Sequence, residues 1–356
     1  MLSHGTASIA AIIALHTLQS ISAPPIASSG CGKSAPVGLL PGGASFNFTV
    51  HSEEGAGQRK YLLHLPLSYT DNEPAPVIIA LHAFGQTTSS MEEITRFSGA
   101  DTNKRYVAVY PEGINNLWLG DPGAPNSSVI DDRPFIQDLL DTVETTLCID
   151  RSRIYTTGFS NGGGLSGLLA CYPPTAGRIA AFSGISAAYY TKESLGYSLF
   201  EMEACNTGAR EGPVPFLDVH GDSDGVIAYD GDNSKFDIDQ DGVPDPDTLP
   251  ILQWLNDWAT RNGCSAAANN TLENYLVTGD VAKSSSWIKN VSIERSVWNC
   301  GGWAEAVTGY YVRGLGHGWP STVPLDGILE EYRGGVTSWN ASALLMEWFS
   351  RWSLPA

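Results

Sequence analysis

Short apolar runs alternate with amphipathic stretches along most of the chain. Residues 61–66 alternate between apolar and polar, which predicts a strand. Continuous apolar runs are typical of strands covered on both faces. They predict strands at 77–82, 106–111, 154–159, 179–185, 214–220 and 310–315. The intervening patterns predict helices at 134–147, 162–171, 249–262 and 339–352, the first of them capped by Asp131 or Asp132. Strands that alternate with helices predict an α/β fold, in which a mostly parallel central sheet carries helices on both faces.

The N-terminal segment differs from the rest of the chain. Residues 7–23 form an apolar run of small residues that is too short for a membrane span, and a stretch rich in proline and serine follows. An ordinary apolar helix is the alternative, but the pattern is typical of a secretory signal. We expect a signal peptide at 1–27, with cleavage between Ser20 and Ser28. Residues 28–356 are expected to form a single domain, because no repeat or linker interrupts the alternation.

Sequons and cysteines are consistent with an exported chain. Glycosylation acceptor patterns begin at Asn47, Asn126, Asn269, Asn290 and Asn340. The six cysteines include no Cys-x-x-Cys pair, which disfavours a zinc or redox site, and an even count in an exported chain predicts three disulfides. We expect Cys264 to pair with Cys300. That bond would close a loop of ~36 residues and stabilise the fold by ~3–4 kcal/mol.

The net charge limits the possible partners. The 356 residues include 20 Lys and Arg against 38 Asp and Glu, which gives a net charge of −18 at pH 7. Phosphate binding needs a basic surface, so nucleic acid and anionic membranes are disfavoured as partners. Acidic charge spread along the chain is typical of a soluble, self-repelling surface. We expect a secreted, extracellular monomer.

The stretch Gly158-Phe-Ser-Asn-Gly162 lies between a predicted strand and a predicted helix. The Gly-x-Ser-x-Gly pattern alone is weak, because a chain with 38 glycines can place a serine in a glycine-rich turn by chance. A sharp strand-to-helix turn is the context in which the pattern marks a nucleophile. Glycines there let backbone approach backbone. We therefore predict that Ser160 is a nucleophile.

A serine hydroxyl needs a base to take its proton. In a sheet of this kind the nucleophile, the acid and the base follow one another in that order along the chain. Only His317 comes after both Ser160 and a suitable acid. The acid is expected after the strand that ends at His220, where Asp222 and Asp224 both qualify. We favour Asp224, since it lies deeper in the turn and an apolar run follows it, and we expect His220 to be structural.

Two backbone N–H groups are needed to hold the negative charge that develops on the carbonyl oxygen. One is expected from Asn161, the residue after the nucleophile, and the other from Phe84, in the loop after the strand at 77–82. Trp319, beside the predicted base, and Trp118 are candidates for the walls of a substrate pocket. The alternative is that both are core residues, as large aromatic side chains more often are.

Together these motifs resemble the secreted feruloyl esterases of carbohydrate esterase family 1. Those enzymes are akin to the poly(3-hydroxybutyrate) depolymerases of the same α/β-hydrolase superfamily. The resemblance rests on these stretches: Ser29-Gly-Cys-Gly-Lys33, Ala80-Leu-His82, Asp131-Asp-x-x-Phe135, 153–163, His220-Gly-Asp-Ser-Asp224, Trp258-Ala-Thr-Arg-Asn-Gly-Cys264 and Gly316-His-Gly-Trp-Pro320. The family usually has glycine where this chain has Ala83.

The resemblance implies an α/β-hydrolase fold and a serine esterase. Ser160 would be its nucleophile, Asp224 its acid and His317 its base, with no cofactor for catalysis. The implied substrates are feruloyl esters of plant cell-wall polysaccharides. The alternatives within this class are a poly(3-hydroxybutyrate) depolymerase and an acetylxylan esterase. From another class, the chain could be a catalytically inactive carbohydrate-binding module whose tryptophans stack on sugars.

The resemblance also implies two further disulfides. By analogy with the family, Cys148 would pair with Cys171. This pairing leaves Cys31 for Cys205.

An acidic stretch follows the predicted acid by about a dozen residues. Asp237, Asp239 and Asp241 fall at alternate positions and a glycine comes next, as at the start of a calcium loop, in which Asp245 would supply the ninth position. The pattern resembles the calcium loops of thrombospondin type 3 repeats and dockerins. It differs from an EF-hand, because Thr248 replaces the bidentate glutamate. The alternative to a structural calcium site is a solvated acidic insertion.

The calcium hypothesis makes a prediction about thermal stability. Clustered carboxylates repel one another unless a cation joins them, so millimolar calcium should raise Tm. The double substitution Asp239→Ala with Asp241→Ala should abolish that rise. A melting curve that neither calcium nor EDTA changes would identify the stretch as acidic surface only.

Overall fold

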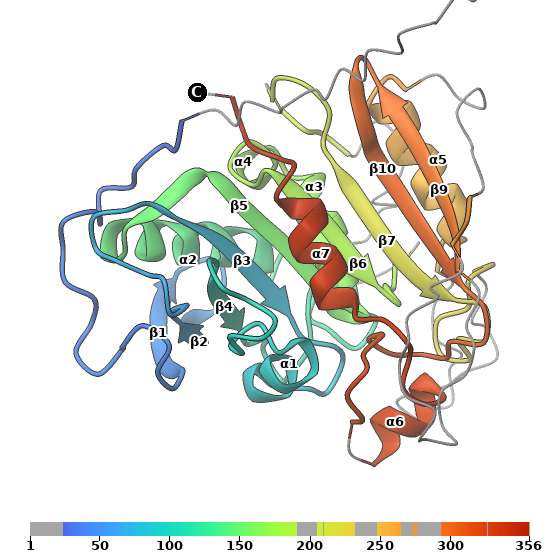
Figure 1. Ribbon diagram of the computed structural model, residues 1–356, viewed down its shortest axis with the longest axis horizontal. Helices are drawn as coiled ribbons and strands as arrows, with labels where there is room; N and C mark the ends of the chain where they lie inside the picture. The colour runs from blue at the N-terminus through green and yellow to red at the C-terminus, as the bar shows by residue number, and fades with distance from the viewer. Residues whose placement is uncertain are drawn as a thin grey trace, which may run out of the picture.

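The computed structural model describes residues 24–190, 205–208, 210–231, 248–264, 273–275, 293–325 and 327–355. Within them the strands form one sheet in the order β1-β2-β4-β3-β5-β6-β7-β10-β9-β8 (Figure 1). The strands are β1 (Phe46–Ser52), β2 (Gly57–His64), β3 (Ala75–Leu81), β4 (Val107–Pro111), β5 (Ile149–Phe159), β6 (Ala181–Ile185), β7 (Phe216–Gly221), β8 (Glu273–Tyr275), β9 (Ile293–Cys300) and β10 (Trp303–Val312).

The centre of the sheet is parallel and its edges are antiparallel. Strands β4, β3, β5, β6, β7 and β10 pair in parallel, while β1 and β2 at one edge and β9 and β8 at the other pair antiparallel. Every residue of β3, β4, β6 and β7 is buried, which is why these strands are continuous apolar runs in the sequence. The predicted mostly parallel central sheet is confirmed.

Helices cover both faces of the sheet. Figure 1 shows α7 crossing in front of the sheet and α2 and α5 behind it. Helix α1 lies on the same side as α7, since Ser342 Oγ in α7 donates a hydrogen bond to the carbonyl of Thr95 in α1 (2.7 Å). The helices are α1 (Thr88–Thr95), α2 (Asp132–Thr146), α3 (Asn161–Ala170), α4 (Pro173–Ala176), α5 (Ile251–Arg261), α6 (Ile328–Arg333) and α7 (Ala341–Phe349).

The last two long strands form a hairpin that the sequence pattern did not predict. Strand β10 begins at Trp303, earlier than the expected start at residue 310, and pairs with β9 across the glycines at 301 and 302. Only part of β9 is buried, so its apolar alternation is weak. Helix α1 was missed for a similar reason, because half of its residues are polar and exposed or half-exposed.

The three disulfides agree with the predicted number, and one predicted pairing is confirmed. Cys264 is bonded to Cys300. The two pairings drawn from the family resemblance, Cys148 with Cys171 and Cys31 with Cys205, are wrong. Instead, the bonds are Cys31–Cys148 and Cys171–Cys205.

Backbone contacts explain both corrections. The N-terminal segment runs along the start of β5, where the N–H of Ser28 donates to the carbonyl of Ile149 (3.0 Å), so Cys31 lies against Cys148. At the end of α3 the N–H of Asn206 donates to the carbonyl of Cys171 (3.2 Å). This contact brings Cys205 to the residue that it bonds.

Several sequence predictions fall on residues outside the described ranges. These are most of the predicted signal peptide, at 1–23, and the calcium-loop aspartates Asp237, Asp239, Asp241 and Asp245. In the part of the chain that the structure describes, no group of three or more His, Cys, Asp or Glu side chains is placed to hold a metal. Within the same residues, no helix combines the length and the apolarity needed to cross a bilayer.

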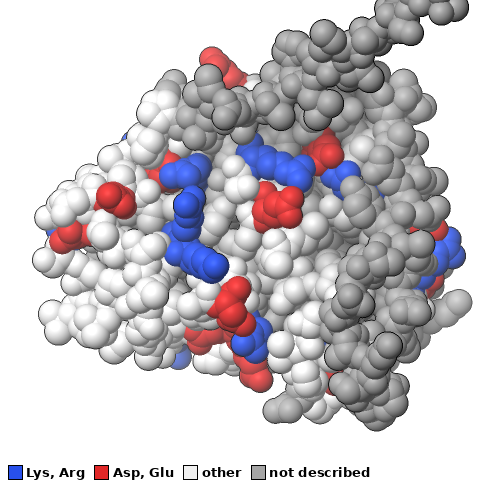
Figure 2. All heavy atoms as spheres, in the orientation of Figure 1, with Lys and Arg blue, Asp and Glu red and all other residues white. Residues whose placement is uncertain are grey.

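The surface view shows how the charged side chains are distributed on one face. Most of the face drawn in Figure 2 carries neither charge, and the basic side chains form a short row or lie next to acidic ones. Among the described residues of this face, the basic side chains therefore form no extended surface of the kind that nucleic-acid binding requires.

Candidate active site

Ser160 occupies the turn between β5 and α3. Its backbone has φ 54° and ψ −120°, a conformation that costs a residue with a side chain about 1–3 kcal/mol. Hydrogen bonds hold the turn: the Ser160 N–H donates to the carbonyl of Ile185 in β6 (3.0 Å), and its carbonyl accepts from the N–H groups of Gly164 (3.1 Å) and Ala188 (3.0 Å). The surrounding structure thus imposes the strain at Ser160, as at the nucleophile turn of α/β-hydrolases.

Two glycines make this turn possible. A Cβ at Gly158 would lie 2.1 Å from the carbonyl oxygen of Gly162, and a Cβ at Gly162 would lie 2.3 Å from that of Leu81 in β3. Both distances are far below van der Waals contact. The glycine flanks are therefore required for the close approach of β5, α3 and β3, as the sequence pattern predicts.

Asp224 and His317, 93 residues apart, are in direct contact. His317 Nδ1 lies 2.8 Å from Asp224 Oδ2, and Asp224 Oδ1 accepts from the N–H groups of Val226 (2.9 Å) and Ile227 (2.8 Å). Burial acts to raise the pKa of Asp224, but the charge of His317 and the hydrogen bonds from His220 and His317 outweigh it and hold that pKa well below its usual range. Because an ionised carboxylate only accepts, His317 donates from Nδ1, and its Nε2 is left to accept a proton.

The loop that carries His317 is fixed from two sides. The imidazole stacks on the ring of Phe159, the residue before Ser160, with 5.0 Å between ring centroids. The N–H of Gly316 donates to the carbonyl of Arg333 in α6 (3.0 Å). His317 is therefore held over the residue next to Ser160 at the carboxyl ends of the parallel strands.

The alternative acid, Asp222, has different partners. Its carboxylate is exposed and accepts hydrogen bonds from the N–H of Gly314 (2.6 Å) and the hydroxyl of Ser223 (2.9 Å). It therefore ties the β7 turn to the end of β10. Of the two candidates, only Asp224 contacts the histidine.

The predicted oxyanion residues are Asn161, which directly follows Ser160, and Phe84, which follows β3. Asn161 is the first residue of α3, so its N–H is one of those that a helix leaves without an intrahelical partner. Phe84 lies in the loop after β3, with 41% of the residue exposed. That loop turns tightly, because the N–H of Gln86 donates to the carbonyl of Ala83 (3.0 Å) and the N–H of Gly85 to that of Asn116 (2.9 Å).

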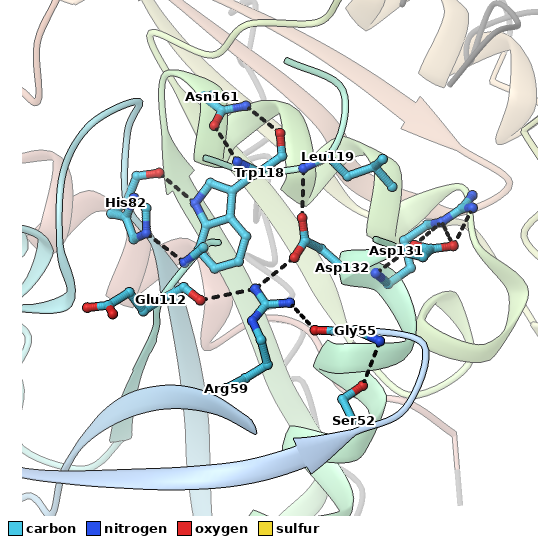
Figure 3. Close-up of polar contacts among 12 residues, drawn as sticks. Ser52, Gly55, Arg59, His82, Glu112, Trp118, Leu119, Asp131, Asp132 and Asn161 are labelled. Atoms are coloured by element: carbon cyan, nitrogen blue, oxygen red, sulfur yellow. Dashed lines mark hydrogen bonds and ion pairs between the residues drawn. The ribbon is translucent and has the colours of Figure 1, made fainter. Parts of the chain in front are cut away.

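A buried network connects these two segments (Figure 3). The side-chain oxygen of Asn161 accepts from the N–H of Trp118 (2.9 Å), and its amide nitrogen donates to the carbonyl of Trp118 (3.3 Å). The indole N–H of Trp118 donates to the carbonyl of His82 (2.9 Å), just before the loop that carries Phe84. Trp118 therefore links the residue after Ser160 to the loop on the opposite side of the predicted oxyanion position.

The proposed role of the two tryptophans in a substrate pocket is wrong. Trp118 and Trp319 are both 0% exposed, so neither can contact a substrate in a pocket open to solvent. Each indole N–H is satisfied inside the protein, that of Trp319 by the hydroxyl of Ser342 in α7 (3.0 Å). They act as core supports directly beneath the site.

His82 is also buried beneath the site. Its Nε2 accepts from the N–H of Gly113 (2.9 Å) and its Nδ1 faces the carbonyl of Ala83 (2.8 Å). Burial lowers the pKa of His82 to about 4. A neutral imidazole with both nitrogens engaged is structural and cannot serve as the base.

The sequence pattern does not predict the buried ion pair of Arg59 and Asp132, shown at the centre of Figure 3. Arg59 donates to Asp132 (2.8 Å) and to the carbonyls of Gly55 (2.9 Å) and Glu112 (3.0 Å). The other Asp132 oxygen accepts from the N–H of Leu119 (2.7 Å). The pair thus positions the residue that follows Trp118.

The only sequence signal for this pair was ambiguous. Two adjacent aspartates suggested a helix cap, and Asp131 does cap α2 by accepting from the N–H of Arg133 (2.9 Å). Asp132 turns inward instead. Its charged partner lies 73 residues earlier in the chain, where no local pattern marks it.

Comparisons with known proteins show what the chain is similar to. No protein-family model matches the chain. Feruloyl esterase D of Neurospora crassa is 31% identical over 214 residues, which span 56% of this chain and 62% of that enzyme. A probable feruloyl esterase C of Aspergillus flavus is 30% identical over 262 residues, which span 72% of this chain and 76% of that protein.

Among solved structures, an acetyl xylan esterase from Aspergillus awamori is similar in fold, with a TM-score of 0.52, 14% identity, and coverage of 87% of this chain and all of that one.

A strained serine after a central parallel strand, with a carboxylate–imidazole pair beyond the next strands, defines an α/β-hydrolase. Within that class, the chain belongs to the feruloyl esterases, a family of carboxylic ester hydrolases.

The buried ion pair gives a testable prediction. Arg59→Met leaves Asp132 buried without its counter-ion, and breaking a buried pair in this way costs about 3–5 kcal/mol. We expect urea denaturation to show a loss of that size. The matched control is Arg96→Met, which removes the exposed partner of Asp101 and should cost about 1 kcal/mol or less. Equal losses in the two variants would contradict the structural role given to Arg59.

Proposed function

We propose that the chain is a secreted serine esterase that hydrolyses feruloyl esters of plant cell-wall polysaccharides. The observation that carries the proposal is the contact between His317 Nδ1 and Asp224 (2.8 Å), held beside the strained turn of Ser160. The relatives named above as feruloyl esterases support this choice of substrate class.

In the proposed first half-reaction, Ser160 Oγ attacks the ester carbonyl carbon and His317 Nε2 takes the hydroxyl proton. Negative charge then develops on the carbonyl oxygen, where the backbone N–H groups of Asn161 and Phe84 stabilise it. Asp224 keeps the imidazole oriented and stabilises the imidazolium. When the tetrahedral species collapses, His317 returns the proton to the departing alcohol oxygen, and the acyl group remains on Ser160.

In the second half-reaction, water attacks the acyl carbon and His317 accepts the water proton. Collapse of the second tetrahedral species breaks the bond to Ser160 Oγ, which regains its proton from His317. The free acid leaves. No step needs an electron acceptor or a metal, because the chain's own residues supply the nucleophile and move every proton.

Export and glycosylation form part of the same proposal. Three disulfides are typical of chains that fold in an oxidising compartment. Two of the sequon asparagines, Asn47 and Asn126, are exposed, as a glycan requires. Both observations support secretion into the medium where cell-wall esters occur.

The triad assignment predicts a specific order of variant activities. Ser160→Ala should lower kcat by about a millionfold, as in other triad enzymes, while the variant stays folded. Asp224→Asn should cost about ten-thousandfold, because the imidazole loses its orientation, whereas Asp222→Asn should keep most of the activity. Hydrolysis of a 4-nitrophenyl ester measures all three, and a larger loss for Asp222→Asn than for Asp224→Asn would reassign the acid.

The substrate class is tested with a panel of esters. We expect the highest kcat/KM with methyl ferulate or methyl sinapate and with feruloylated xylan. A preference for acetylated xylan or for poly(3-hydroxybutyrate) would move the proposal to one of the alternative esterases. If the wild-type chain hydrolyses no ester and binds xylan, it is instead a carbohydrate-binding module.

A further inference from the structure

His220 lies directly behind the catalytic pair, fully buried at the end of β7. Its Nε2 is 2.8 Å from the carbonyl oxygen of Ile227 and 3.3 Å from Asp224 Oδ2, the same oxygen that contacts His317. Its Nδ1 is 3.8 Å from Asp218 Oδ1. The imidazole therefore stands between two buried carboxylates.

The chemistry of these neighbours determines where the protons lie. A carbonyl oxygen and a carboxylate oxygen only accept, so His220 Nε2 carries a hydrogen that it shares between Ile227 and Asp224. Within the described residues, His220 Nδ1 and Asp218 Oδ1 have no hydrogen-bond partner, and the 3.8 Å between them is longer than a hydrogen bond. Asp218 therefore acts on His220 through its charge rather than through a hydrogen bond.

The second carboxylate is itself anchored. Asp218 Oδ2 accepts from the hydroxyl of Tyr189 (2.7 Å), a residue with no exposed surface that stacks on Trp254 of α5 with 4.1 Å between ring centroids. Tyr189, Asp218, His220, Asp224 and His317 thus lie in one buried polar row. It runs from the packed core to the base.

Burial and neighbouring charges shift the pKa values of Asp218 and His220. Burial raises the pKa of Asp218 to about 6. Burial acts to lower the pKa of His220, but the hydrogen bond and charge of Asp224 outweigh it, so the pKa is raised. Among the described residues, two tyrosines also lie beside His220: Tyr229 from the following turn, whose ring contacts the imidazole, and Tyr311, the residue paired with His220 in β10.

We propose that His220 is a positioning residue for ester hydrolysis, whose Nε2–H fixes the Asp224 oxygen that orients His317, while Asp218 and Tyr189 fix His220 in turn. The inference rests on the proposed function, because Asp224 needs orienting only if His317 is the base. His220 would thereby do more than support the turn.

The inference predicts two kinetic effects from loss of the Nε2–H donor. A less constrained Asp224 stabilises the His317 imidazolium less, both in the transition state and in the free enzyme. The kcat value should therefore fall while KM stays unchanged. The acid limb of kcat/KM should move to lower pH, because an imidazolium that is less stabilised loses its proton more readily.

Two substitutions of His220 by amide side chains of different length test this inference. In His220→Gln the amide nitrogen can take the place of Nε2 and donate to Asp224, whereas in His220→Asn the shorter side chain can reach only toward Asp218. We expect His220→Gln to keep kcat within a few-fold of wild type. We expect His220→Asn to lose about tenfold or more, the size of one hydrogen bond to a charged group, with the acid limb about half a pH unit or more lower.

Equal kcat values in His220→Gln and His220→Asn, or a lowered Tm with an unmoved acid limb in His220→Asn, would overturn the inference and leave His220 a structural residue. A wild-type rate equal to that of Ser160→Ala would instead reject the proposed function, which keeps the two failures distinct.

Discussion

The left-handed backbone of Ser160 is the constraint on which the site depends. A side chain at φ 54° is strained, and the strain persists only because the ends of β5 and β6 and the start of α3 hold the residue in place. The close approach of these elements excludes any Cβ at Gly158 and Gly162. The parallel order of β3, β5 and β6 supplies this geometry, so the sheet topology and the reactive serine are one structural requirement.

Two buried polar clusters flank this turn, and each supports one part of the proposed chemistry. Arg59 and Asp132 hold the segment that Asn161 and Trp118 join to the oxyanion side, while His220 lies behind Asp224 on the side of the base. Buried charges are costly unless they are paired and hydrogen-bonded. Here the cost is offset because the two clusters hold the groups of the proposed site in fixed orientations. Groups held in this way need no rearrangement when charge develops in the transition state.

The sequence predicted the parts of the molecule that local pattern and chain order determine. Continuous apolar runs mark buried parallel strands, and the order of a serine, an aspartate and a histidine after successive strands led to the contact of Asp224 with His317. What it did not predict depends on tertiary contacts. Cys31 pairs with Cys148 because the N-terminal segment lies along β5, and Trp118 is buried where its indole N–H can donate to the carbonyl of His82, a residue distant in sequence that follows β3.

Covalent trapping tests whether Ser160 carries the acyl group during turnover. The protein is treated with a serine-directed fluorophosphonate, and residual activity and the labelled peptide are followed together, the latter by mass spectrometry. We expect one label per chain, located on Ser160, with activity lost in proportion to labelling. Full inactivation with the label on another residue, or complete labelling of Ser160 with activity intact, would contradict it.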